Sequence, residues 1–385
     1  MRFRLSESCT EEVYRLLLRN GKIVVLRFGG GTHSSFLFQI KNMASPSDIT
    51  SSQKRREEKR REEKRREEKR RETMVSFYSP YRRDWFLHLR RCETDADISV
   101  NPSYMQHGEN CRAHGLNWRM RSLLVDWMVD VHRSEKLFPE TLFLGVDLLD
   151  RFLQEGSVER TQLQLVGAAC LLIASKTYDI YPPRIDELEH MSDGAFKAAD
   201  VIEMEVSVLS TLRWRVLSPT VFDFLTHSLV WMLEANIEMD IGTEADAPHP
   251  LHTQDDKDKD NDKDDTYHRI SCLAFYVSEL SLLDEVVLKY TPSQRALAAL
   301  YVATAHSTST NFVEFCGWQP TFNRPGTDEE ISDILSCANC MLVLLKDPQM
   351  NTLDLKAISK KHASEVFGHA SEVSPLEHLP EGCII

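Results

Sequence analysis

The segment that begins at Trp118, with the sequence WRMRSLLVDWMVDVHRSEKL, constrains the fold more than any other part of the chain. Its apolar residues recur at spacings of three and four, which is the pattern of an amphipathic helix. These residues are Met120, Leu123, Leu124, Trp127, Met128 and Val131. Two charges, Arg121 and Asp126, interrupt the apolar stretch. A charge this close to a packed face needs a partner, because burying it unpaired costs several kcal/mol.

Helical patterns continue from this segment in two successive sets. The first set ends at Ser218-Pro219, which has the cap and first-turn chemistry of a new helix. The second set is predicted to begin its helices near Thr220, Tyr267, Thr291 and Thr327. The third helix of each set is rich in small residues, which let neighbouring helices approach from several sides. They are Gly167, Ala168, Ala169 and Ala174 in one set and Ala296, Ala298, Ala299 and Ala303 in the other. This internal repeat predicts an all-α fold of two stacked helical units.

The chemistry of the ordered region indicates recognition rather than catalysis. It shows no nucleophile–base pair, phosphate loop or metal-ligand cluster, so we expect no metal and no cofactor. Cys337 and Cys340 are spaced by one helical turn without a second pair, which favours ordinary packing over zinc. No apolar run is long enough to span a membrane, and a near-neutral to acidic body lacks the basic face of a nucleic-acid binder. Nine cysteines without framework spacing fit a reducing compartment.

An ordered series of motifs resembles the cyclin family. The hallmark M-R-x-x-L-V-D-W of the first cyclin-box helix stands here at residues 120–127. LLDRFL (148–153), LQLVGAACLLIASK (163–176) and IYPP (180–183) follow in the family's order. SELSLLD (278–284) and LKYTPS (288–293) are similar to the second box of A/B-type, mitotic cyclins, whereas TLRWRVLSPT (211–220) is closer to the E type. The resemblance covers roughly residues 84–361 and implies two tandem five-helix cyclin-box repeats with a short N-terminal helix.

The resemblance also implies a domain organisation. We expect a leader at 1–73, an N-terminal arm and helix at 74–116, and an N-terminal cyclin box at 117–217. A C-terminal cyclin box is expected at 218–350 and a C-terminal tail at 351–385. Within the second box, residues 234–266 are strongly acidic and end in DDKDKDNDKDD, which predicts a disordered insertion. A solvated spacer is favoured there, and an acidic docking segment is the alternative.

The leader, residues 1–73, contains a period-five KRREE repeat at 54–72. The repeat is compatible with a charged single helix, with a basic localisation patch, or with translated simple-sequence DNA. On the last interpretation the leader is low-complexity and artefactual or dispensable, and the working protein starts at Met74. The competing interpretation is a destruction signal, because residues 2–5 and 15–18 both fit the Arg-x-x-Leu pattern of mitotic cyclins.

Two charged pairs are candidates for a role in the boxes. The resemblance implies that Arg121 and Asp150 form a structural ion pair across the first two helices. It also implies that Lys176 and Glu205 hydrogen-bond the backbone of a partner kinase, whereas the sequence alone favours two solvated charges. Thr177 stands where many cyclins have a phenylalanine that packs on the kinase. Losing that apolar anchor removes about 1–3 kcal/mol, which affects kinase affinity and choice.

A substrate-docking patch is expected on the first helix of the first box. Core packing is the default explanation for its apolar stripe, but the stripe is broader than one neighbouring helix would cover. In cyclins part of it stays exposed as a groove for Arg-x-Leu motifs of substrates and inhibitors. Asp130, where the family usually has glutamate, is expected to pair with the arginine of such a motif. The patch comprises Met120, Leu123, Leu124, Trp127 and Asp130, with Leu163 and Gln164 from the third helix.

The resemblance therefore implies a regulatory subunit of a protein kinase, with no catalytic residue of its own. It would bind a cyclin-dependent serine/threonine kinase, activate it allosterically and help to dock its substrates in cell-cycle control. We expect it in the nucleus and cytoplasm. The alternatives are a kinase-independent scaffold and a cyclin-fold transcription factor, although the latter usually brings a zinc ribbon and a basic face.

Overall fold

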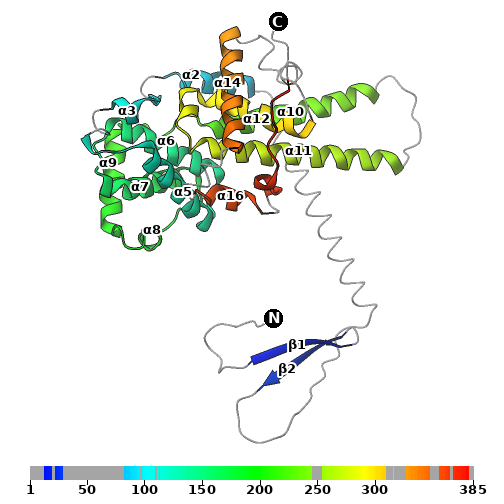
Figure 1. The fold of residues 1–385 in the computed structure, drawn as a ribbon, viewed down its shortest axis with the longest axis horizontal. Helices are drawn as coiled ribbons and strands as arrows, with labels where there is room; N and C mark the ends of the chain where they lie inside the picture. The colour runs from blue at the N-terminus through cyan, green and yellow to red at the C-terminus, as the bar shows by residue number, and fades with distance from the viewer. Residues whose placement is uncertain are drawn as a thin grey trace, which may run out of the picture. The chain divides into compact units, whose positions relative to one another are not determined.

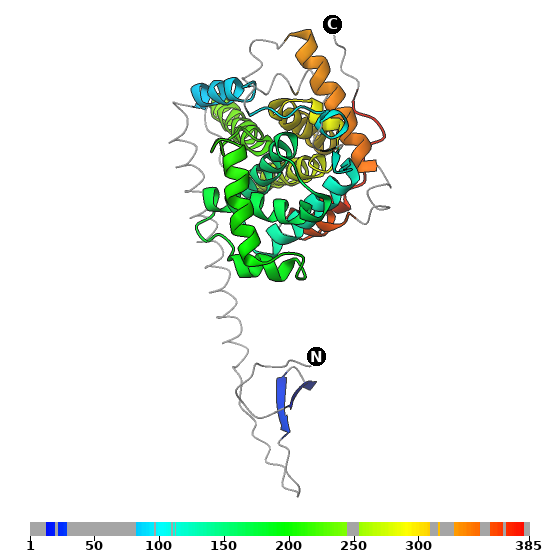
Figure 2. The same ribbon diagram turned by 90° about the vertical axis from the view of Figure 1, so that its left-hand side faces the viewer.

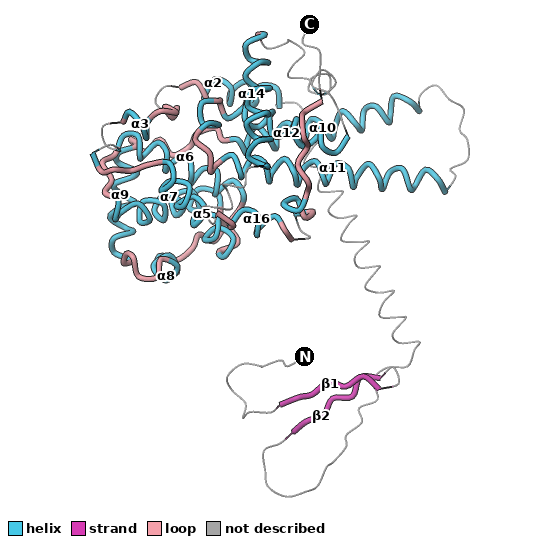
Figure 3. Tube along the Cα trace, in the orientation of Figure 1, coloured by secondary structure: helices cyan, strands magenta, loops and turns pink. Residues whose placement is uncertain are grey.

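The computed structural model describes residues 13–19, 22–28, 82–95, 98–108, 111, 113–244, 254–308, 315, 327–346, 355–364 and 367–380. The chain divides into two compact units, Met1–Phe77 and Tyr78–Ile385. Among the described residues, the strands belong to the first unit and the helices to the second (Figure 3).

The first unit contains an element that the all-α prediction did not include. Strands β1 (Val13–Arg19) and β2 (Lys22–Phe28) pair antiparallel, with Val13 opposite Phe28 and Arg19 opposite Lys22. The sequence carries a signal for this hairpin, because Asn-Gly stands between two apolar runs at residues 20–21. The KRREE repeat at 54–72 lies outside the described residues.

The second unit begins with two short helices and the first five-helix set. Helices α2 (Arg82–Cys92) and α3 (Tyr104–His107) precede the set. The set comprises α5 (Trp118–Ser134), α6 (Pro139–Glu155), α7 (Leu163–Tyr178), α8 (Ile185–Met191) and α9 (Ala198–Thr211). The side chain of Asn117 caps α5 by accepting a hydrogen bond from the Met120 N–H at 3.1 Å. The five helices of this set lie between Trp118 and Thr211.

The second helical set follows directly. Its described helices are α10 (Val221–Glu244), α11 (Gln254–Ser281), α12 (Pro292–Thr308) and α14 (Asp328–Lys346), and α16 (Ala357–His362) comes after them. Figure 1 shows the two sets in separate halves of this unit, and Figure 2 shows the unit from the side of the first set. The prediction of an all-α fold built from two tandem helical boxes is confirmed for the unit.

Small residues allow the central helix of each set to be surrounded, as the sequence predicted. In α7 the residues from Val166 to Ser175 are buried, and in α12 those from Ala296 to Ala305 are buried. Gly167 shows the constraint best, since a Cβ atom there would lie 2.7 Å from the Cδ1 atom of Leu124 on α5. Glycine at this position therefore sets the distance between α5 and α7.

The prediction of a disordered acidic insertion at 234–266 is wrong where the structure describes this segment. Residues 234–244 continue α10, and residues 254–266 form the first part of α11. Figure 1 shows the ends of both helices extending beyond the rest of the unit. Helix propagation from a packed segment is favourable once a nucleus exists. Only residues 245–253 of the insertion lie outside the described residues.

The predicted C-terminal tail is partly a structural element. Leu355, Ala357 and Ile358 are buried, and α16 packs against α5 and α11. Asp126, the second charge of the opening motif, accepts a hydrogen bond from the backbone N–H of Ala357 at 3.0 Å. The Nζ atom of Lys361 donates to Glu279 of α11 at 2.5 Å inside the core. Burial opposes ionisation of Glu279, but Lys361 and His362 outweigh it and lower the pKa of this carboxyl to about 2.

Arg121 is fully buried and joins three parts of the unit. Its Nε and Nη2 atoms each donate to a different carboxylate oxygen of Asp150 on α6, both at 2.6 Å. Its Nη1 atom donates to the backbone carbonyl of Leu282, which follows α11 in the second box, at 2.6 Å. The hydroxyl of Tyr104 on α3 donates to Asp150 at 2.9 Å. The ion pair expected from the sequence is therefore also a link between the boxes.

We expect Arg121→Met to lower the free energy of unfolding by about 3–5 kcal/mol, because it leaves the Asp150 carboxylate buried without its ion pair. Arg119→Met removes the same charge from an exposed position two residues earlier, and should change stability by less than about 0.5 kcal/mol. Urea denaturation followed by circular dichroism measures both variants. Similar losses in the two variants would contradict the role given to Arg121.

Candidate functional site

Lys176 and Glu205 lie together at the surface of the first box. Lys176 is in the last turn of α7, and Glu205 is in the middle of α9. The Nζ atom of Lys176 donates to the Oε1 atom of Glu205 at 2.5 Å, and 45% of the lysine side chain and 15% of the glutamate side chain are exposed. An ion pair this exposed adds about 0–1 kcal/mol to stability, so the fold does not depend on it.

Exposed apolar side chains surround this ion pair. Ile202 and Val206 are one helical turn apart on α9 and flank Glu205, while Ile180 and Tyr181 follow the end of α7. Tyr181 is 87% exposed and Ile180 is 76% exposed. Exposed apolar side chains gathered in one place are typical of a binding surface. We call this surface the α7–α9 face; it comprises Phe138, Lys176, Ile180, Tyr181, Ile202, Glu205 and Val206.

The apolar members of the α7–α9 face were not among the predicted site residues. The motif IYPP at 180–183 contains two of them, but the sequence does not show that they are exposed. Ile202 and Val206 look like the core stripe of an amphipathic helix, and their exposure follows only from the packing of α9. Its Val201 and Val208 are the residues turned to the core.

Thr177 and Asp179 make different hydrogen bonds at the end of α7. The hydroxyl of Thr177 donates to the Ile173 carbonyl of its own helix at 2.9 Å, and the residue is exposed. The carboxylate of Asp179 accepts from the backbone N–H of Phe138 at 2.8 Å and from the hydroxyl of Thr141 at 2.6 Å. Asp179 therefore fixes the start of α6, with the exposed Phe138 before it, to the end of α7.

A buried histidine supports Phe138 from the other side. The Nε2 atom of His132 on α5 hydrogen-bonds the Phe138 carbonyl at 2.9 Å, and its Nδ1 atom is buried without a partner among the described residues. Burial, with the positive charge of Lys361 nearby, lowers the pKa of His132 to about 4. The imidazole is therefore neutral at pH 7 and donates to the carbonyl.

We expect the protein to lose stability as the pH falls from about 6.5 to about 4. In this window the unfolded chain binds a proton at His132 and the folded chain does not, so protonation favours unfolding by up to about 3 kcal/mol. His132→Gln keeps an N–H donor for the Phe138 carbonyl and should flatten the dependence of unfolding free energy on pH. His190→Gln on the exposed surface of α8 is the matched control. Equal slopes in the two variants would contradict the assignment.

The predicted docking patch on α5 is partly exposed and partly core. Leu123 is 45% exposed, and Met120, Trp127 and Gln164 are partly exposed. Leu124 is buried, with its side chain against Gly167. Leu163, the first residue of the central helix α7, is buried as well. Leu124 and Leu163 therefore support the patch from below, and the accessible part consists of the other apolar residues and Gln164.

Polar groups at the edge of this patch already have partners within the chain. The indole N–H of Trp127 donates to the Met191 carbonyl at the end of α8 at 3.4 Å. The carboxylate of Asp130 pairs with Arg133 at 2.9 Å, and both side chains are more than 40% exposed. Because this pair is within one helical turn and solvated, an arginine from a partner can replace Arg133 at little cost.

The structure thus brings together each of the three predicted groups: Arg121 with Asp150, Lys176 with Glu205, and the α5 patch. Cys337 and Cys340 both lie on α14, where burial raises the pKa of the Cys337 thiol to about 12 and disfavours the thiolate that zinc requires. Over the part of the chain that the structure describes, no group of three or more His, Cys, Asp or Glu side chains is placed to hold a metal ion. No helix within those residues is long and apolar enough to cross a membrane.

Comparisons with known proteins identify the two helical sets. The family described as "Cyclin, N-terminal domain" matches residues 84–217, and "Cyclin, C-terminal domain" matches residues 253–376. The first match covers α2 to α9 and the second covers α11 to α16.

Curated relatives agree with these matches. The G2/mitotic-specific cyclin-A of Hydra viridissima is 32% identical over 298 residues, which are 77% of this chain and 60% of that protein. The G2/mitotic-specific cyclin-2 of Medicago sativa is 30% identical over 285 residues, which are 73% of this chain and 72% of that protein. The chain belongs to the cyclin family, and its resemblance to A/B-type cyclins is confirmed.

The extent of these matches differs between relatives. The chain spans less than two thirds of the length of the Hydra protein. Among solved structures, the viral cyclin from herpesvirus saimiri aligns with a TM-score of 0.45 and 19% identity, over 60% of this chain and 89% of that chain.

Proposed function

We propose that this cyclin is a regulatory subunit that binds a cyclin-dependent serine/threonine kinase and activates it allosterically. The observation that carries the proposal is the α7–α9 face, where an exposed ion pair lies among exposed apolar side chains. The apolar residues supply buried area on binding, and the two charged residues supply directional hydrogen bonds.

The ion pair is suited to a change of partners. In the free chain Lys176 and Glu205 satisfy each other at little gain in stability. A partner that presents backbone carbonyl and N–H groups, as the end of a helix does, can take the lysine and the glutamate respectively. The exchange then costs the cyclin little, and a rigid surface remains to hold the bound helix in one position.

Activation follows from that position and needs no catalytic atom from the cyclin. A kinase is competent when a lysine–glutamate pair and its metal-binding loop are both in place, which depends on one regulatory helix. Holding that helix inward shifts the kinase population toward the active state. Phosphoryl transfer itself belongs to the kinase in this proposal.

We expect Lys176→Ala with Glu205→Ala to reduce kinase binding by at least tenfold, because both directional contacts are lost. The measurement is kinase co-purification together with phosphorylation of a short peptide. Arg160→Ala with Glu329→Ala removes the same charges from exposed positions, at the opposite end of α7 and on α14, and should leave binding unchanged. Normal kinase activation by the first double variant would contradict the proposal and favour a kinase-independent scaffold.

The α5 patch is proposed to dock substrates and inhibitors that carry Arg-x-Leu motifs. Leu123 with Met120 and Trp127 offers an apolar surface for the leucine, and Asp130 offers a carboxylate for the arginine. The accessible patch lies on α5 and at the start of α7, whereas Lys176 is in the last turn of α7 and Glu205 is on α9. Docking and kinase binding are therefore separable by mutation.

We expect Leu123→Ala to slow phosphorylation of Arg-x-Leu substrates several-fold and to leave short peptides without the motif unaffected. Leu124→Ala, one residue later, opens a cavity against α7 and should lower the unfolding free energy by about 2–5 kcal/mol. Kinetic assays on both substrates and a thermal melt of each variant separate the two effects. If Leu123→Ala slowed both substrates equally, the docking role would be wrong.

A further inference from the structure

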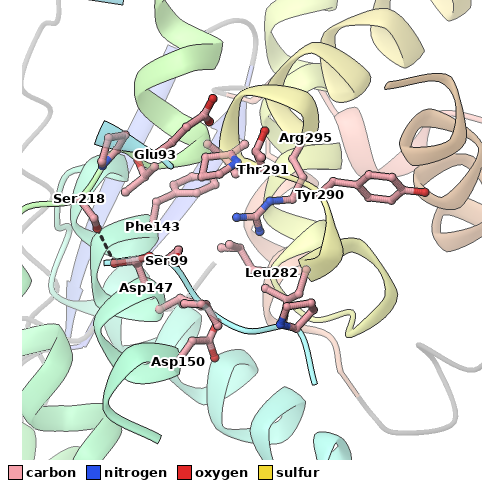
Figure 4. A pocket seen from close by; sticks show the side chains of 18 of the residues that line it. Glu93, Ser99, Phe143, Asp147, Asp150, Ser218, Leu282, Tyr290, Thr291 and Arg295 are labelled. Carbon is pink, nitrogen blue, oxygen red and sulfur yellow. Dashed lines mark hydrogen bonds between the residues drawn. The ribbon is translucent and has the colours of Figure 1, made fainter. Parts of the chain in front are cut away.

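A cavity of about 140 Å³ lies where the two boxes meet. Its wall combines residues of α5 and α6 with residues from the end of α11 to the first turn of α12, and it includes the linker before α10. Figure 4 shows the side chains of Phe143 and Asp147 on one side and those of Leu282 and Arg295 on the other. The cavity is separate from both the α7–α9 face and the α5 patch.

The carboxylates in the wall already have partners. Asp150 accepts from Arg121, Asp147 accepts from Ser218 and Arg151, and Glu93 accepts from Arg90 and Ser293. Each of the three carboxylates is therefore already hydrogen-bonded by at least one other side chain of the protein. None of the three forms an ion pair with Arg295.

Arg295 differs from every other charged group in this wall. Its guanidinium points into the cavity, facing Asp147 and Asp150 across it (Figure 4). Its Nε atom is buried and has no hydrogen-bond partner among the described residues. Burial lowers the pKa of Arg295, although the more distant Cys337, Asp150 and Asp147 oppose the effect. The side chain stays charged at neutral pH, because an arginine begins from a pKa above 12.

Arg295 is a partly buried cation with an unpaired Nε donor, which favours a counter-charge that fits its geometry. The guanidinium carries five N–H donors in a planar fork, which matches a phosphate or carboxylate group through two parallel hydrogen bonds. A volume of about 140 Å³ exceeds the roughly 10–15 Å³ that one water molecule requires, and it accommodates an ion of a few heavy atoms. We propose that this cavity binds a small oxyanion, a phosphate or a carboxylate, through the side chain of Arg295.

Such an anion would act on the junction of the boxes. Arg295 is on α12 of the second box, and the opposite wall is formed by α6 of the first box. A ligand that binds only when the two boxes are packed together stabilises that packing, and the stabilisation grows with the logarithm of its concentration above Kd. The inference stands apart from kinase binding, because neither Lys176 nor Glu205 contributes to the cavity.

The test is the melting temperature of the full chain at pH 7 and constant ionic strength, with chloride replaced stepwise by inorganic phosphate or by acetate. We expect a rise of about 5–10 °C when the effective anion is present at roughly 100 times its Kd, growing with the logarithm of its concentration. A response to phosphate alone or to acetate alone supports the proposal and identifies the group bound. Equal melting temperatures in all three salts would overturn it, since a cavity that holds only water is indifferent to the anion.

Arg295→Met shows whether the response comes from this site. The variant should melt no lower than the wild type in chloride, because it removes a partly buried charge that has no ion-pair partner in the cavity wall, and it should lose the anion response. Arg119→Met, at an exposed position on α5, should keep that response. A retained response in Arg295→Met overturns the assignment, and so does a strongly lowered melting temperature of that variant in chloride. Isothermal titration of the wild type with the same salts gives a one-site curve if the proposal holds, without relying on any variant.

Discussion

The buried guanidinium of Arg121 is the interaction on which the arrangement of the helical unit depends. Its N–H groups donate hydrogen bonds to the Asp150 carboxylate of α6 and to the Leu282 carbonyl of the second box. A charge with no exposed surface must be matched completely, so the positions of α5, α6 and the end of α11 are fixed relative to one another. Ser122 adds a second link, because its hydroxyl donates to the Leu283 carbonyl at 2.7 Å. The two boxes therefore pack in one register, and the cavity beside Arg295 is part of the same junction.

The two surfaces proposed to bind partners do not contribute to the cavity at this junction. Lys176 and Glu205 pair at the surface, and Asp130 and Arg133 form a solvated pair. Such pairs contribute little to folding, so their side chains remain free to exchange partners. What holds them in place is buried: Asp179 and His132 fix Phe138 from two directions. Because the supporting groups are buried and the ion pairs are at the surface, one box combines a rigid apolar surface with charged side chains that can change partners.

The sequence predicted those features that depend on local pattern or on one pair of charges. The amphipathic stripe from Met120 identified α5, the small residues identified α7 as a central helix, and Arg121 required a partner that the resemblance placed at Asp150. Features that depend on the relation between distant segments were not predicted. The carbonyl of Leu282 has no side-chain signal, and exposure of Ile202 is set by how α9 packs. The acidic segment was predicted to be disordered from its composition, and composition does not show that the packed helices α10 and α11 continue into it. The β1–β2 hairpin was not predicted either, although Asn-Gly between two apolar runs favours a hairpin turn.

The second charge of the opening motif completes the argument about the junction. Asp126 lies on α5 about one and a half turns after Arg121, and it binds the backbone N–H of Ala357 at the start of α16. Lys361 of the same helix donates to Glu279 on α11, a carboxyl group whose ionisation burial opposes and Lys361 favours. The C-terminal segment is thus tied to both boxes by groups that are expensive to leave unpaired. Both charges that interrupt the apolar stripe of α5 bind backbone of later segments, so the motif that begins the first box also places the second.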